Sequence, residues 1–476
     1  MTTPAAEPTP GSAVRAPRQA PTDLTITFAE EAAVRRTSAA LGEPGWLLED
    51  RLAALARFAE LPIETNQLYT TYIDLRSARL AGAVPYEAPA TVVEAGGDRP
   101  AALPAGADGL IEIREDRLPA LVLSPEARAA GVVLETFGAA LRRDPSALRS
   151  RLQGGPLLPT DDKLAALTRA TWNQGVFLLV PDGVRLEHPI IVRWALGVPG
   201  RALVTRTIVA LGEDAGLSLV EEQEESEAGA AAAAAVAAGG EVGQAFFAGT
   251  TEVVLGRGAN LSVASLQDFP GHVVAFQHRF ARAAEGASLH WALAQLGTRL
   301  VRSRVDNRLE GDHSSVEQVE IVFGGDDQLF DLTSYTRHVG RDTTGNLLSK
   351  SALQDAARSY MKGLITIERS AVGTDSFLGE FGMNLSKQAR AVAIPSLEID
   401  QPDCRRAAHS SSVGPIDEAQ LFYLESRGIP PDEARKFIVL GFLEPVVARV
   451  PLASAQDRLR ELLEEKWAAG RRSAVA

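Results

Sequence analysis

The residues of this chain best suited to metal or thiol chemistry lie close together near its C-terminus. His409 carries an imidazole that can ligate iron or transfer a proton near neutral pH. Cys404 is the single cysteine among 476 residues. One cysteine excludes a disulfide framework, a zinc site built on paired cysteines, and a four-thiolate cluster site supplied by this chain alone.

A second group of polar residues resembles a site for a hard metal ion, because carboxylates and a histidine fall within a short stretch. Its members are Glu310, Asp312, His313, Glu317 and Glu320. Charged residues along strands and turns more often form a solvated face, and we favour that interpretation. The pair His272 and His278 has no matching cysteine or carboxylate pattern, so we predict that it is structural.

Several classes of protein are excluded by composition and motifs. No glycine is followed directly by lysine, which excludes a Walker A loop, and neither Gly-x-Ser-x-Gly nor His-Glu-x-x-His occurs. A formal charge of −13 argues against nucleic acid or an anionic membrane as the main partner. No apolar run reaches the ~20 residues that span a bilayer. We expect a soluble, cytoplasmic protein with a disordered, Pro/Ala/Thr-rich tail over residues 1–22.

The middle of the chain contains a repeat of strand, glycine turn and strand. Its clearest copies are 209–219 and 253–263, and Leu217, Leu261, Leu289 and Val316 occupy equivalent places at intervals of 44, 28 and 27 residues. The acidic and alanine-rich run 224–240 accounts for the longer interval if it is an inserted loop. Repeats of this length stack to bury their apolar faces, which predicts a parallel β-helix. A β-sandwich with chance similarity between turns is the alternative.

Helical patterns flank this β-rich region on both sides. We predict a mainly β protein with four parts, namely the tail, a mainly helical domain over 23–174, a parallel β-helix over 175–402 and a helical domain over 403–476. Helical ends are expected on a solenoid because they cover edges that would otherwise expose unpaired strands.

The C-terminal motifs resemble the SufB/SufD family, the β-helix subunits of the SUF iron–sulfur cluster assembly complex. The motifs are Ala393-Ile-Pro-Ser-Leu-Glu-Ile399, His409-Ser-Ser-Ser-Val-Gly414, Asp417-Glu-Ala-Gln-Leu-Phe-Tyr-Leu-Glu-Ser-Arg-Gly-Ile429 and Gly441-Phe442. The resemblance implies a right-handed parallel β-helix between helical domains. It also implies assembly with a paralogous, SufB-like subunit and with a SufC-like ABC-type ATPase, which agrees with the missing Walker A loop.

Within this family the chain is more similar to the SufD-like subunits. SufB-like chains carry a cysteine ahead of the proline motif, and alignment on Pro395 places Glu380 there. SufD-like chains keep a histidine near the partner's cysteine, and His409 matches it. Two features depart from the usual Cys-Ser-His-Gly-Ala-Thr motif of the family. Ala407 stands where some members have cysteine, and Ser410-Ser411-Ser412 replace Gly-Ala-Thr. The resemblance thus implies that His409, Cys404 and Glu380 lie at a cluster-assembly interface, with His409 as the candidate metal ligand.

The C-terminal helices form the usual ATPase-docking surface of this family. Carried over to this chain, the docking candidates are Leu421, Phe422, Tyr423, Arg427, Phe437 and Phe442. The expected role is that of a non-catalytic scaffold that binds no cofactor tightly on its own and holds a cluster transiently at a subunit interface. The alternatives are a β-helix enzyme acting on carbohydrate and a homodimeric SufB-like scaffold.

Overall fold

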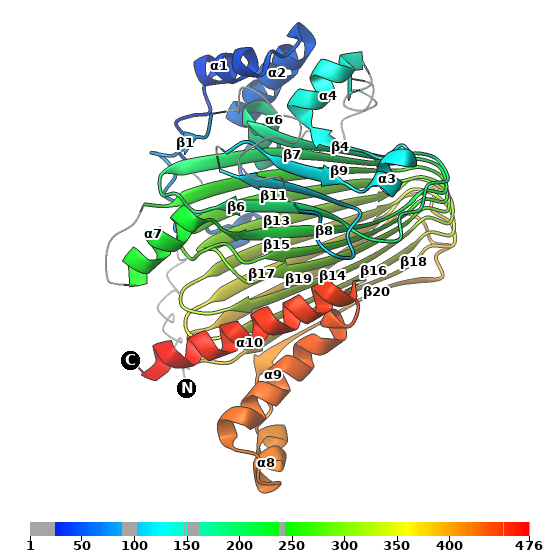
Figure 1. Ribbon diagram of the computed structural model, residues 1–476. Coiled ribbons are helices and arrows are strands. Elements are labelled where there is room, and N and C mark those ends of the chain that lie inside the picture. The colour runs from blue at the N-terminus through cyan, green and yellow to red at the C-terminus, as the bar shows by residue number, and fades with distance from the viewer. Residues whose placement is uncertain are drawn as a thin grey trace, which may run out of the picture.

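A parallel β-solenoid forms the body of the molecule (Figure 1). The computed structural model describes residues 24–87, 102–115, 117–146, 148–149, 161–237, 243–450 and 452–475, so the predicted tail lies outside the described residues. The strands form two ten-stranded sheets, and from β5 to β20 successive strands alternate between them, so that each turn of the solenoid adds one strand to each sheet. Sheet A has the order β19-β17-β15-β13-β11-β9-β7-β5-β4, with β1 paired to β7, and sheet B has the order β20-β18-β16-β14-β12-β10-β8-β6-β2-β3. The predicted parallel β-helix is confirmed.

The strands of the solenoid are mostly eight to eleven residues long. Sheet A contains β1 (Val84–Pro85), β4 (Val133–Thr136), β5 (Gln174–Val180), β7 (Arg201–Leu211), β9 (Ala245–Leu255), β11 (Val273–Ala283), β13 (Leu300–Leu309), β15 (Leu329–His338), β17 (Arg358–Ile367) and β19 (Arg390–Ile399). Sheet B contains β2 (Gly109–Arg114), β3 (Ala120–Leu123), β6 (Ile190–Leu196), β8 (Gly216–Glu225), β10 (Asn260–Gln267), β12 (Ser288–Gln295), β14 (Ser315–Gly324), β16 (Thr344–Leu353), β18 (Asp375–Asn384) and β20 (Arg406–Pro415).

The sequence repeat is the repeat of the solenoid. Leu261 pairs in register with Leu217 on one side and Leu289 on the other, and Leu289 pairs with Val316. Three residues before each aligned position, the chain turns through a residue of positive φ, a conformation that glycine and short polar residues adopt most easily. These turn residues are Asp214, Gly258, Gly286, His313, Asp342 and Gly373.

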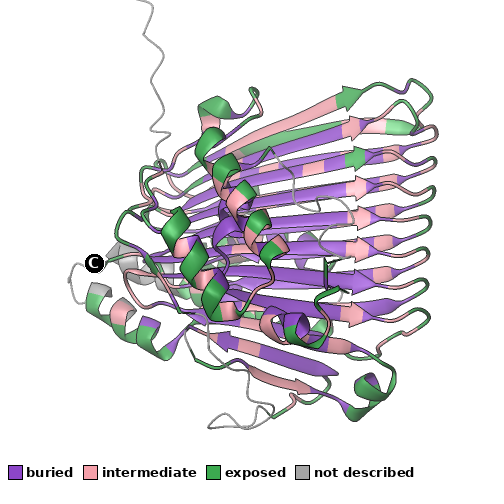
Figure 2. Cartoon of the chain, turned by 90° about the horizontal axis from the view of Figure 1, so that it is seen from above, coloured by how far each residue is buried: buried purple, intermediate pink, exposed green. Residues whose placement is uncertain are grey.

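The lumen between the two sheets is filled mainly by apolar side chains. Trp194, Phe247 and Trp291 are almost completely buried there, together with valine, leucine and alanine residues from both sheets. Successive side chains of a strand point to opposite faces, so every second residue faces the lumen. Figure 2 shows buried residues throughout the stacked strands and more exposed residues in the last strands of the stack.

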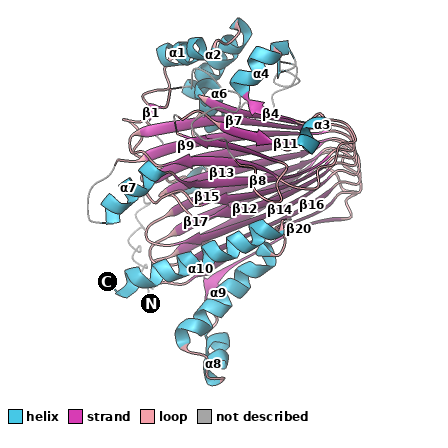
Figure 3. Cartoon of the chain, in the orientation of Figure 1, coloured by secondary structure: helices cyan, strands magenta, loops and turns pink. Residues whose placement is uncertain are grey.

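The N-terminal helices pack on the outer face of sheet A near its first strands (Figure 3). They are α1 (Glu31–Leu41), α2 (Gly45–Glu60), α4 (Phe137–Arg143) and α6 (Lys163–Thr171), with a 3-10 turn at Thr70–Tyr72. The short helix α3 (Pro125–Ala129) instead contacts the luminal core through Ala127. The same region also supplies β1 to β4, which extend both sheets, so the part predicted as mainly helical contributes to the solenoid. The tertiary pairing of β2 with β6 and of β4 with β5 stabilises these short strands.

The C-terminal helices are α8 (Glu418–Ser426), α9 (Pro431–Val447) and α10 (Ala453–Val475). Buried residues of α9 and α10 pack on the outer face of sheet B, whereas α8 contributes no buried residue and projects away from the solenoid (Figure 1). None of the described helices is both long and apolar enough to cross a membrane.

Two details differ from the sequence-based expectations. Within the run 224–240, residues 224–237 do not form a loop: β8 continues to Glu225 and α7 (Glu227–Ala237) follows, because its alanines have the highest helix propensity. The solenoid also continues past the predicted boundary at residue 402. Segment 406–415 forms β20, because backbone pairing with β18 overrides the weak strand propensity of its alanines, serines and glycine.

Candidate functional site

The C-terminal end of the solenoid is open. β19 is the last strand of sheet A and β20 is the last strand of sheet B, and no further strand within the described residues covers either one. Apolar side chains at this end remain exposed, with 46% of Ile399 and 40% of Val413 accessible to solvent. We call the surface formed by β19 and β20 the open end.

His409 faces the mouth of the lumen at the open end. It pairs in register with Leu378 of β18, which is fully buried in a small apolar cluster inside the last turns. In-register residues of neighbouring parallel strands point to the same side of the sheet. The imidazole is therefore directed across the mouth, and His409 is exposed because β20 is the last strand of its sheet.

Glu380 lies one strand deeper than the mouth. It pairs in register with Ser411 of β20 and is only 1% exposed. One carboxylate oxygen accepts a hydrogen bond of 2.8 Å from the backbone N–H of Ile394 on β19. Burial, with a smaller contribution from the negative charge of Glu320, raises the pKa of Glu380 to about 8. At neutral pH this side chain is predominantly a neutral carboxylic acid inside the lumen.

Cys404 is not brought next to His409. It lies in the turn before β20 and packs, half-buried, against the apolar cluster that contains Leu378. His409 is three residues into the strand that begins at Arg406, so the two side chains are separated by about 10 Å or more along the strand. A shared metal ion needs ligand atoms at about 2.0–2.3 Å from it, so these residues do not form a common site.

The docking candidates divide into exposed and half-buried residues. Phe422, Tyr423 and Phe437 are 72%, 57% and 55% exposed, and Arg427 lies over the ring of Tyr423. Phe442 is different, because Lys350 of β16 lies over its ring and donates a hydrogen bond to its backbone carbonyl. Leu421 is also half-buried. The exposed aromatic residues thus lie on α8 and the first half of α9, which we call the helical arm.

The acidic residues between 310 and 320 do not converge on a metal site. Glu310 pairs with Arg282, and Glu317 lies 3.6 Å from Arg449. His313 is one of the positive-φ turn residues, and Glu320 is buried in the lumen. In the part of the chain that the structure describes, no group of three or more histidine, cysteine or acidic side chains is placed to hold a metal ion.

Comparison with known proteins agrees with the fold and with the motifs at the open end. The family model for the SUF system FeS cluster assembly, SufBD core domain, matches residues 195–442, which is more than half of the chain. The chain belongs to this family.

Curated relatives in this family include both paralogues. The iron–sulfur cluster assembly protein SufD of Bacillus subtilis is 27% identical over 428 residues, covering 89% of this chain and 94% of the relative. SufB of the same organism is 25% identical over 429 residues, covering 88% of this chain and 89% of the relative. A SufBD family protein of Staphylococcus haemolyticus is 25% identical over 439 residues and 90% of each chain. The predicted SufD-like resemblance is confirmed at the level of sequence similarity.

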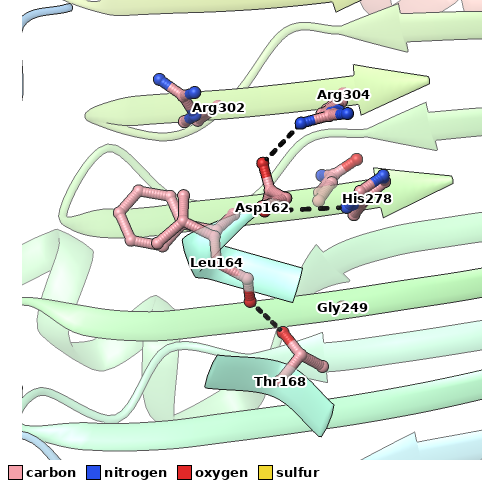
Figure 4. Close-up of a pocket in the computed structure, with 9 residues that line it drawn as sticks. Asp162, Leu164, Thr168, Gly249, His278, Arg302 and Arg304 are labelled. Carbon is pink, nitrogen blue, oxygen red and sulfur yellow. Dashed lines mark hydrogen bonds and ion pairs between the residues drawn. The ribbon is translucent and has the colours of Figure 1, made fainter. Parts of the chain in front are cut away.

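This SufBD family member also contains a buried charged layer that the sequence analysis missed. It lies between the N-terminal segments and the outer face of sheet A, around a small pocket (Figure 4). Asp162, the N-cap residue of α6, accepts a hydrogen bond from Arg304, and Asp306 accepts hydrogen bonds from Arg304 and bonds to His278. Burial alone would raise the pKa of Asp306, but Arg304 and His278 lower it to about 2.

The same layer continues toward the open end. Arg302 pairs with Glu64 at 2.9 Å and with Asp331 at 3.1 Å, and Lys362 pairs with the other oxygen of Asp331. Tyr69, in the segment after α2, donates a hydrogen bond to the carbonyl of Gly363 on β17. These contacts fasten the N-terminal segments to sheet A. Arg302, Arg304 and Asp306 occupy every second position of β13, so their side chains lie on the same face of sheet A. This spacing of two is the signal in the sequence that could have identified them as a group.

Proposed function

We propose that the chain is a non-catalytic scaffold subunit of iron–sulfur cluster assembly, acting through the open end. In this proposal the open end pairs with a second β-solenoid subunit of SufB-like type. The observation that carries the proposal is the pair of uncovered ten-residue strands, β19 and β20. Unpaired edge strands expose rows of backbone N–H and C=O groups that favour pairing with another chain.

The exposed side chains at the open end support the same role. Ile399 and Val413 belong to the luminal pattern, yet both are exposed because the solenoid stops there. A partner that continues the stacking would bury them as the earlier turns bury their equivalents. A second copy of this chain would bury the same residues, so the test must distinguish a paralogue from a homodimer.

Cluster assembly would take place at this subunit interface, with the cluster as cargo. His409 is exposed at the mouth and supplies one nitrogen ligand. Cys404 lies too far along the chain to join it, so the remaining ligands come from the partner. This arrangement agrees with the single cysteine and assigns the main thiolate to the SufB-like subunit.

The helical arm is the proposed docking site of a SufC-like ABC-type ATPase. Phe422, Tyr423 and Phe437 expose aromatic surface on an arm that projects from the solenoid, and aromatic residues are enriched at protein interfaces. α9 and α10 also cover sheet B, so deletion of the whole C-terminal region would expose part of the core. Point substitutions on the arm are therefore a sharper test than truncation.

The proposal is tested by co-expression of the tagged chain with a SufB-like paralogue and a SufC-like ATPase, followed by affinity purification. We expect both partners to co-purify with the wild type. Ile399→Lys combined with Val413→Lys should lose the paralogue, because inward-facing lysines at an edge oppose strand pairing. The matched control is Val84→Lys with Leu118→Lys, at positions 53% and 40% exposed elsewhere on the surface, which should retain both partners.

Phe422→Glu with Phe437→Glu should lose the ATPase and keep the paralogue in the same purification. Leu68→Glu, at a residue 54% exposed outside the arm, is its control. Failure of both partners to co-purify with the folded wild type would contradict the proposal. If this chain alone forms a stable dimer, and Ile399→Lys with Val413→Lys disrupts that dimer, the open end binds a second copy of this chain and not a paralogue.

A further inference from the structure

The two edge strands of the open end differ in the backbone groups that they expose. In a parallel sheet, successive residues of a strand direct their N–H and C=O groups alternately to the two sides of the strand. An edge strand therefore bonds to its one neighbour through every second residue, and the residues between these direct their backbone groups to the free side. The hydrogen bonds at the ends of β19 and β20 identify which residues are free in each strand.

β19 bonds to β17 through its even-numbered residues. The N–H of Arg390 donates to the carbonyl of Ala357 at 3.0 Å, and the N–H of Asp400, directly after β19, donates to the carbonyl of Ile367 at 2.9 Å. The register between the two strands is continuous from one end of β19 to the other. The residues of β19 that direct their backbone groups to the free side are therefore 391, 393, 395, 397 and 399.

Two of these five positions on β19 have no N–H available to a partner. Residue 395 is a proline, which has no N–H, and its ring stands at the free side in the middle of the strand. The N–H of Ala391 already donates to Oδ1 of Asn384 at 3.0 Å. Proline in an edge strand is one of the features by which proteins prevent a further strand from pairing. The free edge of sheet A is thus interrupted at its middle and occupied near its beginning.

β20 exposes an uninterrupted row of backbone groups instead. β18 bonds to β16 through odd-numbered residues, since the N–H of Asp375 donates to the carbonyl of Thr343, so its even-numbered residues bond to β20. The N–H of Arg406 accordingly donates to the carbonyl of Thr374 at 3.2 Å, and the register is continuous along β20. The only proline of β20 is its last residue. The residues that direct both N–H and C=O to the free side are Ala407, His409, Ser411 and Val413.

We propose that the partner adds its strand to β20, so that sheet B continues across the interface, and contacts β19 through side chains. The occupant is an edge strand of a second β-solenoid, because His409 and Val413 face a lumen that such a partner would continue. We assign it to the SufB-like paralogue, because a charge of −13 on each copy opposes the pairing of two copies of this chain. The inference rests on the proposed function and specifies the edge that serves it.

The choice of edge decides which partner residues come close to His409. Residues directly opposite each other in an antiparallel pair have their Cα atoms about 4.5–5.5 Å apart. A strand added to β20 therefore places a partner side chain next to the imidazole, where the two can bind one metal ion. A strand added to β19 would lie on the other sheet, and facing sheets are about 10 Å apart.

The consecutive serines of β20 allow a matched pair of proline substitutions. Ser411→Pro removes an N–H on the free side, so the variant should keep a Tm near that of the wild type. It should bind the purified paralogue about tenfold more weakly, because a carbonyl of the partner strand loses its donor. Ser410→Pro removes an N–H directed to β18 and should lower the Tm markedly. Circular dichroism and calorimetric titration give the two measurements. Wild-type affinity in folded Ser411→Pro would overturn the proposal.

Ala393→Pro makes the corresponding change on the free side of β19. It should weaken binding of the paralogue much less than Ser411→Pro does, because β19 supplies side chains and not a ladder of backbone bonds. Equal losses of affinity in the two variants would show that the partner pairs with both edges, which contradicts the proposal. Ala407→Pro, at another free position of β20, takes the place of Ser411→Pro if that variant does not fold.

Amide hydrogen exchange at single-residue resolution tests the same inference without a substitution. In the isolated chain, the free amides of β20 should exchange faster than the even-numbered amides between them. Binding of the paralogue should slow the exchange of 407, 409, 411 and 413 by about tenfold or more, and that of 393 and 397 much less. A complex in which β20 gains no protection would refute this inference but not the proposed function. If the folded chain binds no paralogue at all, both are wrong, and a dimer of this chain alone that protects β20 would refute the assignment to the paralogue.

Discussion

The two ends of the solenoid are built differently. At the N-terminal end, Leu123 of β3, Ala127 of α3 and Leu134 of β4 join the luminal core, and all three are buried. At the C-terminal end, none of the described segments covers β19 and β20 in this way, and Ile399 and Val413 face solvent from luminal positions. The same inward-facing pattern is thus buried at one end and exposed at the other.

A similar difference separates the buried acids of the two regions. Asp306, Asp331 and Glu64 on the outer face of sheet A each lie against an arginine or lysine. Glu320 and Glu380, nearer to the open end, are buried and form no ion pair with any described residue, and burial raises the pKa of Glu320 to about 7. The acids under the N-terminal segments are thus held in ion pairs, whereas the two acids nearer to the open end lie in an environment that does not favour their charge.

The largest expected effect is on stability, and it separates an isoleucine at the covered end of the solenoid from one at the open end. Ile111 of β2 is completely buried in the luminal core, so Ile111→Ala should lower the free energy of unfolding by about 3 kcal/mol through lost burial and a cavity. Ile399→Ala, at a residue 46% exposed, should cost less than about 1 kcal/mol. Equilibrium urea unfolding followed by circular dichroism measures both values.

The same two variants should also differ in partner binding. Ile399→Ala should weaken the complex with the paralogue, because the side chain becomes buried there, whereas folded Ile111→Ala should bind normally. Equal losses of stability at the two positions would show that the open end is not distinct from the covered one.

Much of the solenoid could be predicted from local sequence. The turn pattern predicts that Leu217, Leu261 and Leu289 are equivalent positions, and they pair in register. This succeeded because one turn of a solenoid is a local unit that repeats along the chain. The insertion at 224–240 was located by the same reasoning, although its alanines form a helix and not a loop.

The partners of the site residues could not be predicted in the same way. Alignment on Pro395 identified Glu380, but its contact with Ile394 depends on how β18 and β19 face each other across the lumen. The charged layer joins Asp162 to Arg304, which are 142 residues apart in sequence. Burial of these charges results from the N-terminal segments that cover sheet A, and no local pattern carries that information.

The next expected effect concerns His409 in a confirmed complex. His409→Ala should preserve assembly, because the side chain is exposed in the isolated chain, but should lower the affinity for iron by about tenfold or more. Iron and sulfide bound after anaerobic reconstitution give the measurement. Cys404→Ser is the matched control, since Cys404 packs in the turn before β20 and should leave cluster content nearly unchanged. Full cluster content in His409→Ala would exclude this residue as a ligand.

The smallest expected effect is local to the helical arm, which resembles the open end in lacking cover. α8 has no buried residue, and its first turn is capped by Asp417, which accepts hydrogen bonds from the N–H groups of Ala419 and Gln420. Asp417→Ala should therefore destabilise α8 by about 1 kcal/mol and leave global unfolding unchanged. Hydrogen exchange should become faster in α8 alone, and ATPase binding should weaken modestly.

Asp417→Asn preserves an N-cap acceptor and should behave like the wild type. Faster exchange in the solenoid strands as well would mean that the arm is coupled to the body and is not an independent docking element.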